Sequence, residues 1–152
     1  MSNEYKDLFR NRSEEAKEWV AKYPFLRFKN NDCCPWENTE EIESCWMFEL
    51  PVGWINAFGE KMCDELLEAL GEYVDDWTIL QAKEKFGEMR IYHCWQNNHP
   101  GQDERHDLIN NIIDKYSNIS YKTCVHCGKP ADIRTVGGWI APYCHDCYIR
   151  FR

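Results

Sequence analysis

Four cysteines near the C-terminus have the spacing of a metal site. They form two Cys-x-x-Cys pairs, Cys124 with Cys127 and Cys144 with Cys147, separated by sixteen residues. Each pair can form a tight turn, or knuckle, that directs two thiolates at one ion, and two knuckles complete the tetrahedron that Zn²⁺ prefers. We therefore predict one bound zinc ion. Because four thiolates leave no open coordination position, we expect this zinc to stabilise the fold and to perform no catalysis.

The residues between the two pairs are typical of a zinc ribbon. Residues 131–136 and 139–143 predict two short strands around a Gly-Gly turn. Two disulfides are the alternative, but no secretory signal opens the sequence, so we expect metal. His126 and His145 lie inside the pairs and either could replace a thiolate. Because four cysteines already complete the shell, we expect both histidines in exposed loops.

The rest of the sequence predicts an acidic body of helices and strands. Apolar residues at helical spacing predict helices over residues 4–22, 53–70 and about 102–119, and alternation predicts a strand at 46–50 and a β-hairpin of 77–82 and 89–94 around a turn at 83–87. The predicted fold class is α+β, with helices packed on a small antiparallel sheet and a C-terminal zinc ribbon. We expect a body of residues 1–121 and a ribbon of residues 122–152 that packs on it.

Charge is distributed unevenly along the chain. The net charge is −8, but residues 1–121 contain 13 Lys and Arg against 24 Asp and Glu, while residues 122–152 contain 5 against 2. This body disfavours a nucleic-acid backbone, which is bound through Lys and Arg. Its acids either form a solvated face or dock on a basic partner. The candidate docking residues are Glu37, Glu40, Glu41, Glu43, Asp64, Glu68, Asp75 and Asp76.

Other side chains suggest weaker sites. Bases and one tryptophan in the hairpin and ribbon could contact a nucleic acid or another anion, although a solvated surface explains them as well: Lys83, Lys85, Arg90, Lys129, Arg134 and Trp139. The remaining cysteines could form a second metal site with nearby histidines, but none has knuckle spacing and burial as small apolar residues is the simpler interpretation: Cys33, Cys34, Cys45, Cys63 and Cys94.

Two motifs in a fixed order carry a family resemblance. A Lys-Glu-Lys-Phe-Gly-x-x-Arg-x-Tyr hairpin over residues 83–92 precedes the ribbon, in which Gly-Gly-Trp lies between the cysteine pairs. In this order the sequence resembles a group of small proteins encoded by phages and prophages, over about residues 50–148. The resemblance implies a phage setting and the cytoplasm of a bacterial host, and it supplies no catalytic residues.

These observations favour a binding protein over an enzyme. The sequence contains no nucleophile paired with a base, no glycine-rich phosphate loop and no His-x-Glu motif of zinc deaminases. No apolar run approaches the length of a membrane span. We expect a non-enzymatic zinc protein that binds a host protein, inhibiting or redirecting a nucleic-acid-handling or defence protein in the manner of an anti-CRISPR or DNA-mimic protein. The alternatives are a nucleic-acid-binding module that uses the basic ribbon, and an enzyme whose site assembles from distant residues.

Overall fold

The fold was analysed in a computed structural model, which describes residues 3–28 and 42–152, with side chains from residue 12 onward. Within these residues the chain has the predicted α+β fold, with helices, a long β-hairpin and a second small antiparallel sheet flanked by the four clustered cysteines. No helix in this part of the chain is long and apolar enough to cross a membrane.

The N-terminal part is one helix followed by a tight turn. Helix α1 (Asn3–Lys22) ends before Pro24, because the residue preceding a proline is disfavoured in the helical conformation. A short 3-10 helix, η1 (Pro24–Leu26), follows and buries Phe25 and Leu26. Buried Ala16 and Val20 attach α1 to the same core.

The strand predicted at residues 46–50 is wrong. This segment is a 3-10 helix, η2 (Trp46–Glu49). The buried residues between positions 46 and 50 are Met47 and Leu50, which lie three positions apart, while Trp46 and Phe48 are half-buried. Helical spacing therefore explains the burial better than the alternation of large side chains that suggested a strand.

The helix predicted from residue 53 to residue 70 is present but interrupted. It consists of α2 (Val52–Trp54), a π-helical turn η3 (Ile55–Gly59) and α3 (Glu60–Leu70). Gly71 ends it at a φ of 53°, as its predicted C-cap role requires. A further 3-10 segment, η4 (Gly71–Asp76), leads into the hairpin.

The predicted hairpin is longer than its pattern indicated. Strands β1 (Trp77–Lys85) and β2 (Glu88–Trp95) pair antiparallel, with a register shift between Ile79 and Gln81. The connecting turn is only Phe86 and Gly87. Lys83 and Lys85, which were predicted to lie in the turn, therefore belong to β1.

Helix α4 (Gln102–Ser120) begins at the predicted position and leads directly into the ribbon. There β3 (Asp132–Val136) and β4 (Trp139–Tyr143) form the predicted second hairpin. A final helix, α5 (His145–Phe151), was not predicted. Because His145 is its first residue, this histidine lies in a helix and not in a loop.

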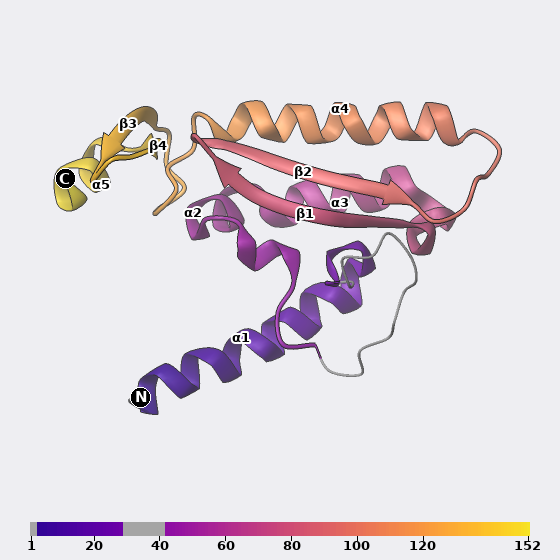
Figure 1. Cartoon of the computed structure of the whole chain (residues 1–152), viewed down its shortest axis with the longest axis horizontal. Helices are drawn as coiled ribbons and strands as arrows, with labels where there is room; N and C mark the ends of the chain where they lie inside the picture. Colours follow the sequence, from indigo (N-terminus) through magenta and orange to yellow (C-terminus); the bar gives the residue numbers. More distant parts are fainter. Residues whose placement is uncertain (1–2, 29–41) are drawn as a thin grey trace.

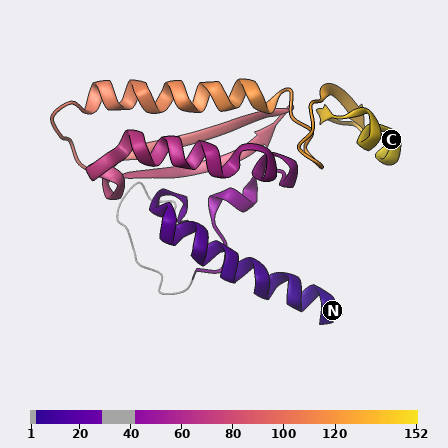
Figure 2. The same cartoon turned by 180° about the vertical axis from the view of Figure 1, so that it is seen from behind.

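The body is arranged around the first hairpin. Helix α4 runs along it and contacts both β2 and α3, while η1 and η2 contact β1 (Figures 1 and 2). The largest side chains enclosed between these elements include Trp54, Trp77, Tyr23, Tyr116 and Phe25. The ribbon lies at the end of the hairpin where β1 turns into β2, so the β1–β2 turn is close to the β3–β4 turn.

Candidate functional site

The four ribbon cysteines form the only group of metal-ligating side chains in the described part of the chain. Their Sγ atoms all lie within 4.8 Å of one another, and those of Cys127 and Cys144 are 3.5 Å apart. Four sulfurs bound tetrahedrally at about 2.3 Å from one ion are separated by about 3.8 Å. The observed spacing therefore suits a metal ion of the size of Zn²⁺, held by Cys124, Cys127, Cys144 and Cys147.

Two backbone arrangements build the knuckles. In the first, Gly128 has a φ of 78° and its N–H donates to the carbonyl oxygen of Cys124 at 3.0 Å. In the second, the Cys144 sulfur caps α5 by accepting a hydrogen bond from the N–H of Cys147 at 3.4 Å. Helix α5 thus places the last two thiols on one side of its first turn, which explains why a helix follows the hairpin.

Burial and hydrogen bonding give the clustered thiols different pKa values. Burial opposes ionisation of Cys124, but backbone hydrogen bonds at Cys144, Cys127 and His126 outweigh it and lower its pKa to about 7. Burial raises the pKa of Cys147 to about 12, and hydrogen bonds with the other three cysteines add to the rise. One thiol of the cluster therefore ionises readily, whereas ionisation of a further thiol is opposed. A bound cation would stabilise the additional thiolates.

The neighbouring histidine does not join this cluster. His126 is exposed, as predicted, and its ring stacks on Phe151 at a centroid distance of 4.2 Å. This contact ties the end of α5 to the first knuckle. Four cysteines, without an imidazole, are therefore the ligand set that the structure supports.

The first knuckle is hydrogen-bonded to the start of α2. The N–H of Gly53 donates to the Val125 carbonyl at 2.9 Å, and Trp54 Nε1 donates to the Thr123 carbonyl at the same distance. Trp54 is fully buried in the body. The ribbon is therefore attached to the body through buried groups and not through a free linker. The boundary at residue 121 stays a prediction.

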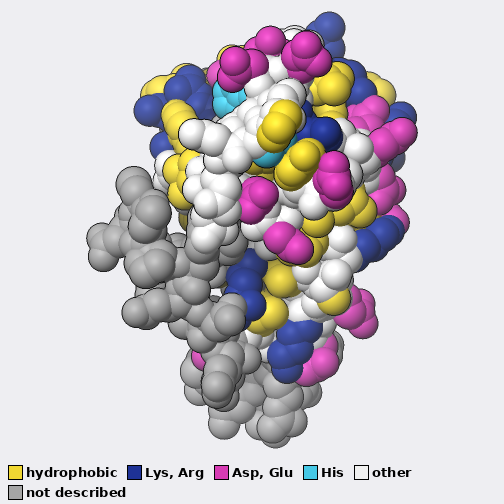
Figure 3. Space-filling model, turned by 90° about the vertical axis from the view of Figure 1, so that its right-hand side faces the viewer, with side chains coloured by type: hydrophobic (Ala, Val, Ile, Leu, Met, Phe, Trp, Pro, Cys, Tyr) yellow, Lys and Arg dark blue, Asp and Glu magenta, His cyan; other side chains and the backbone are white. Residues whose placement is uncertain are grey.

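The predicted acidic docking residues are spread over several elements. Glu37, Glu40 and Glu41 lie outside the described residues. Glu43, Glu68 and Asp75 are exposed, Asp76 is half-buried, and Asp64 accepts a hydrogen bond from the Tyr23 hydroxyl at 2.5 Å. At the end of the molecule away from the ribbon, Lys and Arg are interspersed among the acids (Figure 3). The acids do not form one continuous surface on that face.

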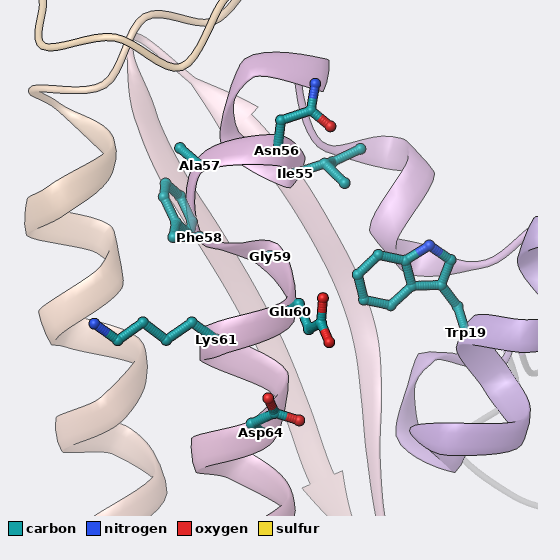
Figure 4. A pocket seen from close by; sticks show the side chains of 9 residues that line it. All are labelled: Trp19, Ile55, Asn56, Ala57, Phe58, Gly59, Glu60, Lys61 and Asp64. Carbon is teal, nitrogen blue, oxygen red and sulfur yellow. The ribbon is translucent and has the colours of Figure 1, made fainter.

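Of the predicted docking acids, Asp64 lines a groove between α1 and α3, together with acids that were not predicted. Two adjoining hollows, of about 490 and 290 Å³, share Trp19 and Glu60. Trp19 faces the chain from Ile55 to Glu60 across the larger hollow, whereas Lys61 points to the other side of α3 (Figure 4). Acids border the groove from both helices, namely Glu15, Glu18, Glu60 and Asp64. We call this the Trp19 groove.

The predicted anion-binding residues are only partly brought together. Lys83, Lys85 and Trp139 line two neighbouring hollows between β1 and β4. Arg90 instead pairs with Glu88 at 3.5 Å, and Arg134 lies 3.9 Å from Asp132 and stacks over the Tyr148 ring. Lys129 is exposed. These bases do not converge on one site.

The remaining predicted metal ligands form no second centre among the described residues. Cys45 and Cys63 are buried and burial raises the pKa of each thiol, so they behave as small apolar side chains. Cys94 is half-buried. Cys33 and Cys34 lie outside the described residues.

Comparison with protein families, with curated proteins and with solved structures found no match for this chain.

Two features of these sites were missed from the sequence. Trp19 packs partly against the core from α1, and it also borders the groove beside Glu15 and Glu18. Phe86 was treated as a turn residue, although an exposed phenylalanine before glycine in a two-residue turn is unusual. The sequence shows these residues but not the helix that faces Trp19 or the length of the turn that contains Phe86.

Proposed function

We propose that this chain is a zinc-stabilised, non-catalytic binding protein that docks on a basic segment of a partner protein through the Trp19 groove. The observation that carries this proposal is the arrangement of carboxylates on both sides of a half-exposed tryptophan. Zinc, held by the four cysteines, would contribute folding free energy to the ribbon and leave binding to the surface.

The α3 side of the groove is an acidic row. Glu60, Asp64 and Glu68 follow one another at intervals of four residues, which places them along one side of α3. Across the groove, Glu15 and Glu18 project from α1. Repeated acids at this spacing repel one another unless cations lie between them, so the row favours a positively charged partner.

Only part of this charge is neutralised within the chain. Lys22 lies 3.3 Å from Glu60 and 3.7 Å from Asp64, and both pairs are exposed. Exposed ion pairs contribute less than about 1 kcal/mol, so a partner cation can replace Lys22 at little cost. Glu15, Glu18 and Glu68 form no ion pair among the described side chains.

Arginine and lysine side chains fit this chemistry best. The face of a tryptophan attracts a guanidinium or ammonium group, and adjacent carboxylates accept its hydrogen bonds. In the phage setting implied by the sequence resemblance, host proteins that handle nucleic acids expose such basic segments. Occupying one of them would block or redirect its contact with phosphates.

A charge-reversal pair separates groove binding from net charge. The probe is a fluorescein-labelled peptide with two arginines among apolar residues, titrated with the full chain by fluorescence anisotropy. Glu15→Lys combined with Glu18→Lys should weaken binding at least about tenfold. The matched control is Asp107→Lys with Asp114→Lys, which changes net charge equally on exposed positions of α4. Equal losses in the two variants would reject the groove and leave only long-range attraction.

A further inference from the structure

A second cleft lies where the β1–β2 turn meets the ribbon. Two hollows of about 320 and 520 Å³ adjoin there, and both are lined by Glu84 and Trp139. One wall comes from the end of β1 and its turn, and the other from β4. The two walls are about fifty residues apart in sequence, so only the folded ribbon creates this space. We call it the Trp139 cleft.

Large apolar side chains at the cleft are left in solvent. Phe86 is 64% exposed and Trp139 is 61% exposed, and Ile140 next to Trp139 is also exposed. Single exposed apolar residues are common on protein surfaces, but a group rimming a cleft marks an interaction site. Neither aromatic ring is needed for the core, which encloses other residues.

Phe86 also adopts a backbone conformation that disfavours it. Its φ is 52° and that of Gly87 is 85°, so both residues of the turn are in the left-handed region. A two-residue turn of this kind prefers Asn-Gly, and a bulky residue at the first position is strained. Glycine is required at position 87 because its φ of 85° strains any L side chain, and a Cβ there would also lie 2.7 Å from Ile133 Cδ1. No such packing requires the phenyl ring, and strain of this kind is typical of functional positions.

The cleft is bordered by strand edges that are only partly paired. On β4, the Pro142 carbonyl points outward, since it accepts a hydrogen bond from the Val125 N–H at 3.0 Å. Backbone groups two residues apart on a strand point to the same side, so the N–H and C=O of Ile140 also point outward. They have no hydrogen-bond partner within the described residues.

The facing edge of β1 is free for the same reason. The backbone groups of Met89 point outward from the hairpin. Its N–H donates to Ser120 Oγ at 2.9 Å, and its carbonyl accepts from the Ser117 hydroxyl at 2.8 Å. Its cross-strand partner Glu84 therefore turns its own backbone groups to the opposite side, toward the cleft. Within the described part of the chain these groups also lack a partner. Free strand edges accept an extended chain.

The charges of the cleft select against other ligands. Lys83 and Lys85 are balanced by Glu49 and Glu84, so the lining carries no net charge. A nucleic acid would require an excess of Lys and Arg in the lining, and a basic peptide would require an excess of Asp and Glu. Neither excess is present. A neutral lining with exposed aromatic rings suits an uncharged, apolar chain.

We propose that the Trp139 cleft binds an extended, apolar segment of a partner protein by adding it as a strand. Backbone hydrogen bonds at Ile140 and Glu84 fix its register, while Trp139 and Phe86 receive its side chains. This surface is separate from the Trp19 groove and does not depend on it.

Selection of peptides on the intact zinc-loaded chain tests this proposal. Twelve-residue peptides are panned from a random displayed library, synthesised and titrated by isothermal calorimetry. We expect enriched peptides of net charge near zero that are rich in aromatic and β-branched residues. N-methylation of alternate backbone amides should weaken binding at least about tenfold, which a purely apolar contact would not show.

Substitution at the turn distinguishes binding from folding. Phe86→Asn should relieve the strained turn and raise Tm by about 2–4 °C, while weakening peptide binding at least about tenfold. Trp139→Ala should also lose binding, and the Glu15→Lys, Glu18→Lys variant should retain it. The proposal is overturned if no peptide is enriched, if N-methylation has no effect, or if Phe86→Asn binds peptide normally. It is also overturned if the cleft binds a second copy of the chain or a single-stranded oligonucleotide in place of a peptide.

Discussion

Gly53 and Gly128 lie back to back where the body meets the first cysteine knuckle. A Cβ on Gly53 would stand 2.1 Å from the Cys124 carbonyl oxygen and 2.8 Å from the Gly128 nitrogen, and a Cβ on Gly128 would stand 2.7 Å from the Gly53 carbonyl oxygen. Backbone atoms cannot rotate away from such contacts as side chains do. The two glycines allow the knuckle and the start of α2 to share one packed interface.

Adding a methyl group at this interface should separate the ribbon from the body. Gly53→Ala meets backbone on all sides, so we expect a loss of about 3 kcal/mol or more in the free energy of unfolding, measured by urea denaturation. Gly101→Ala is the control, because it has open space around it although its φ is 78°. Similar losses for the two variants would mean that the contact at Gly53 is relieved by small shifts.

Metal analysis of the purified protein should find about one zinc per chain. Cys124→Ser together with Cys144→Ser should abolish this zinc, because it removes one thiolate from each knuckle. Cys94→Ser, at a half-buried position on β2, should retain it. A metal-free protein with a normally folded ribbon would contradict the prediction.

Removing the metal should change the environment of a tryptophan in the body. Trp54 is buried and its indole N–H donates to the Thr123 carbonyl beside the first knuckle. Loosening of the knuckle by a chelator should therefore weaken this bond and admit water, shifting the fluorescence maximum to longer wavelength. Trp54→Phe should remove most of that shift. A shift that persists in this variant would assign it to another tryptophan, such as the exposed Trp139.

Acid should destabilise the protein partly through His93. Trp77 Nε1 donates to His93 Nδ1 at 3.1 Å, and His93 Nε2 lies 3.0 Å from Asn110 Oδ1, so the ring is neutral with its proton on Nε2. Burial lowers the pKa of His93 in the folded state and outweighs the hydrogen bond with Asn110, which raises it, while nearby His106 lowers it further. Stability is then complete above the unfolded pKa of about 6.5 and decreases as the pH falls below it.

Comparison of Tm at pH 7.5 and pH 5.5 measures this effect. Acid also protonates the ribbon thiols, so the informative quantity is the difference between the wild-type chain and His93→Gln. The variant should show the smaller decrease in Tm, because glutamine stays neutral over this range. Equal decreases would show that His93 has the same pKa in both states.

Elements with their own periodic pattern were predictable from the sequence. The helix around Leu66 buries its apolar stripe, and the helix around Ile109 buries part of its own, with Leu108 and Ile119 left exposed. The four cysteines come together as their spacing indicated. Local chemistry dictates these features, because side chains three or four apart share a helix face and each Cys-x-x-Cys turn is self-contained.

Features that depend on distant contacts were not predictable. The segment around Met47 was assigned the wrong structure because its burial is decided by β1 and the π-helical turn, which the local alternation does not contain. Likewise, the predicted docking acids were chosen from a run of sequence, whereas the groove selects Glu15 and Glu18 from a helix outside that run. Charge density along a chain does not show which acids face one another.

The hydrogen bond from the Val125 N–H to the Pro142 carbonyl affects how the two proposed binding surfaces respond to their surroundings. It joins the first knuckle to β4, so the wall of the Trp139 cleft is held in place by the same residues that hold the cysteines. The Trp19 groove is built from α1, η3 and α3, without any ribbon residue. Under zinc starvation or thiol oxidation, the protein would lose its recognition of an extended chain and still attract a basic one.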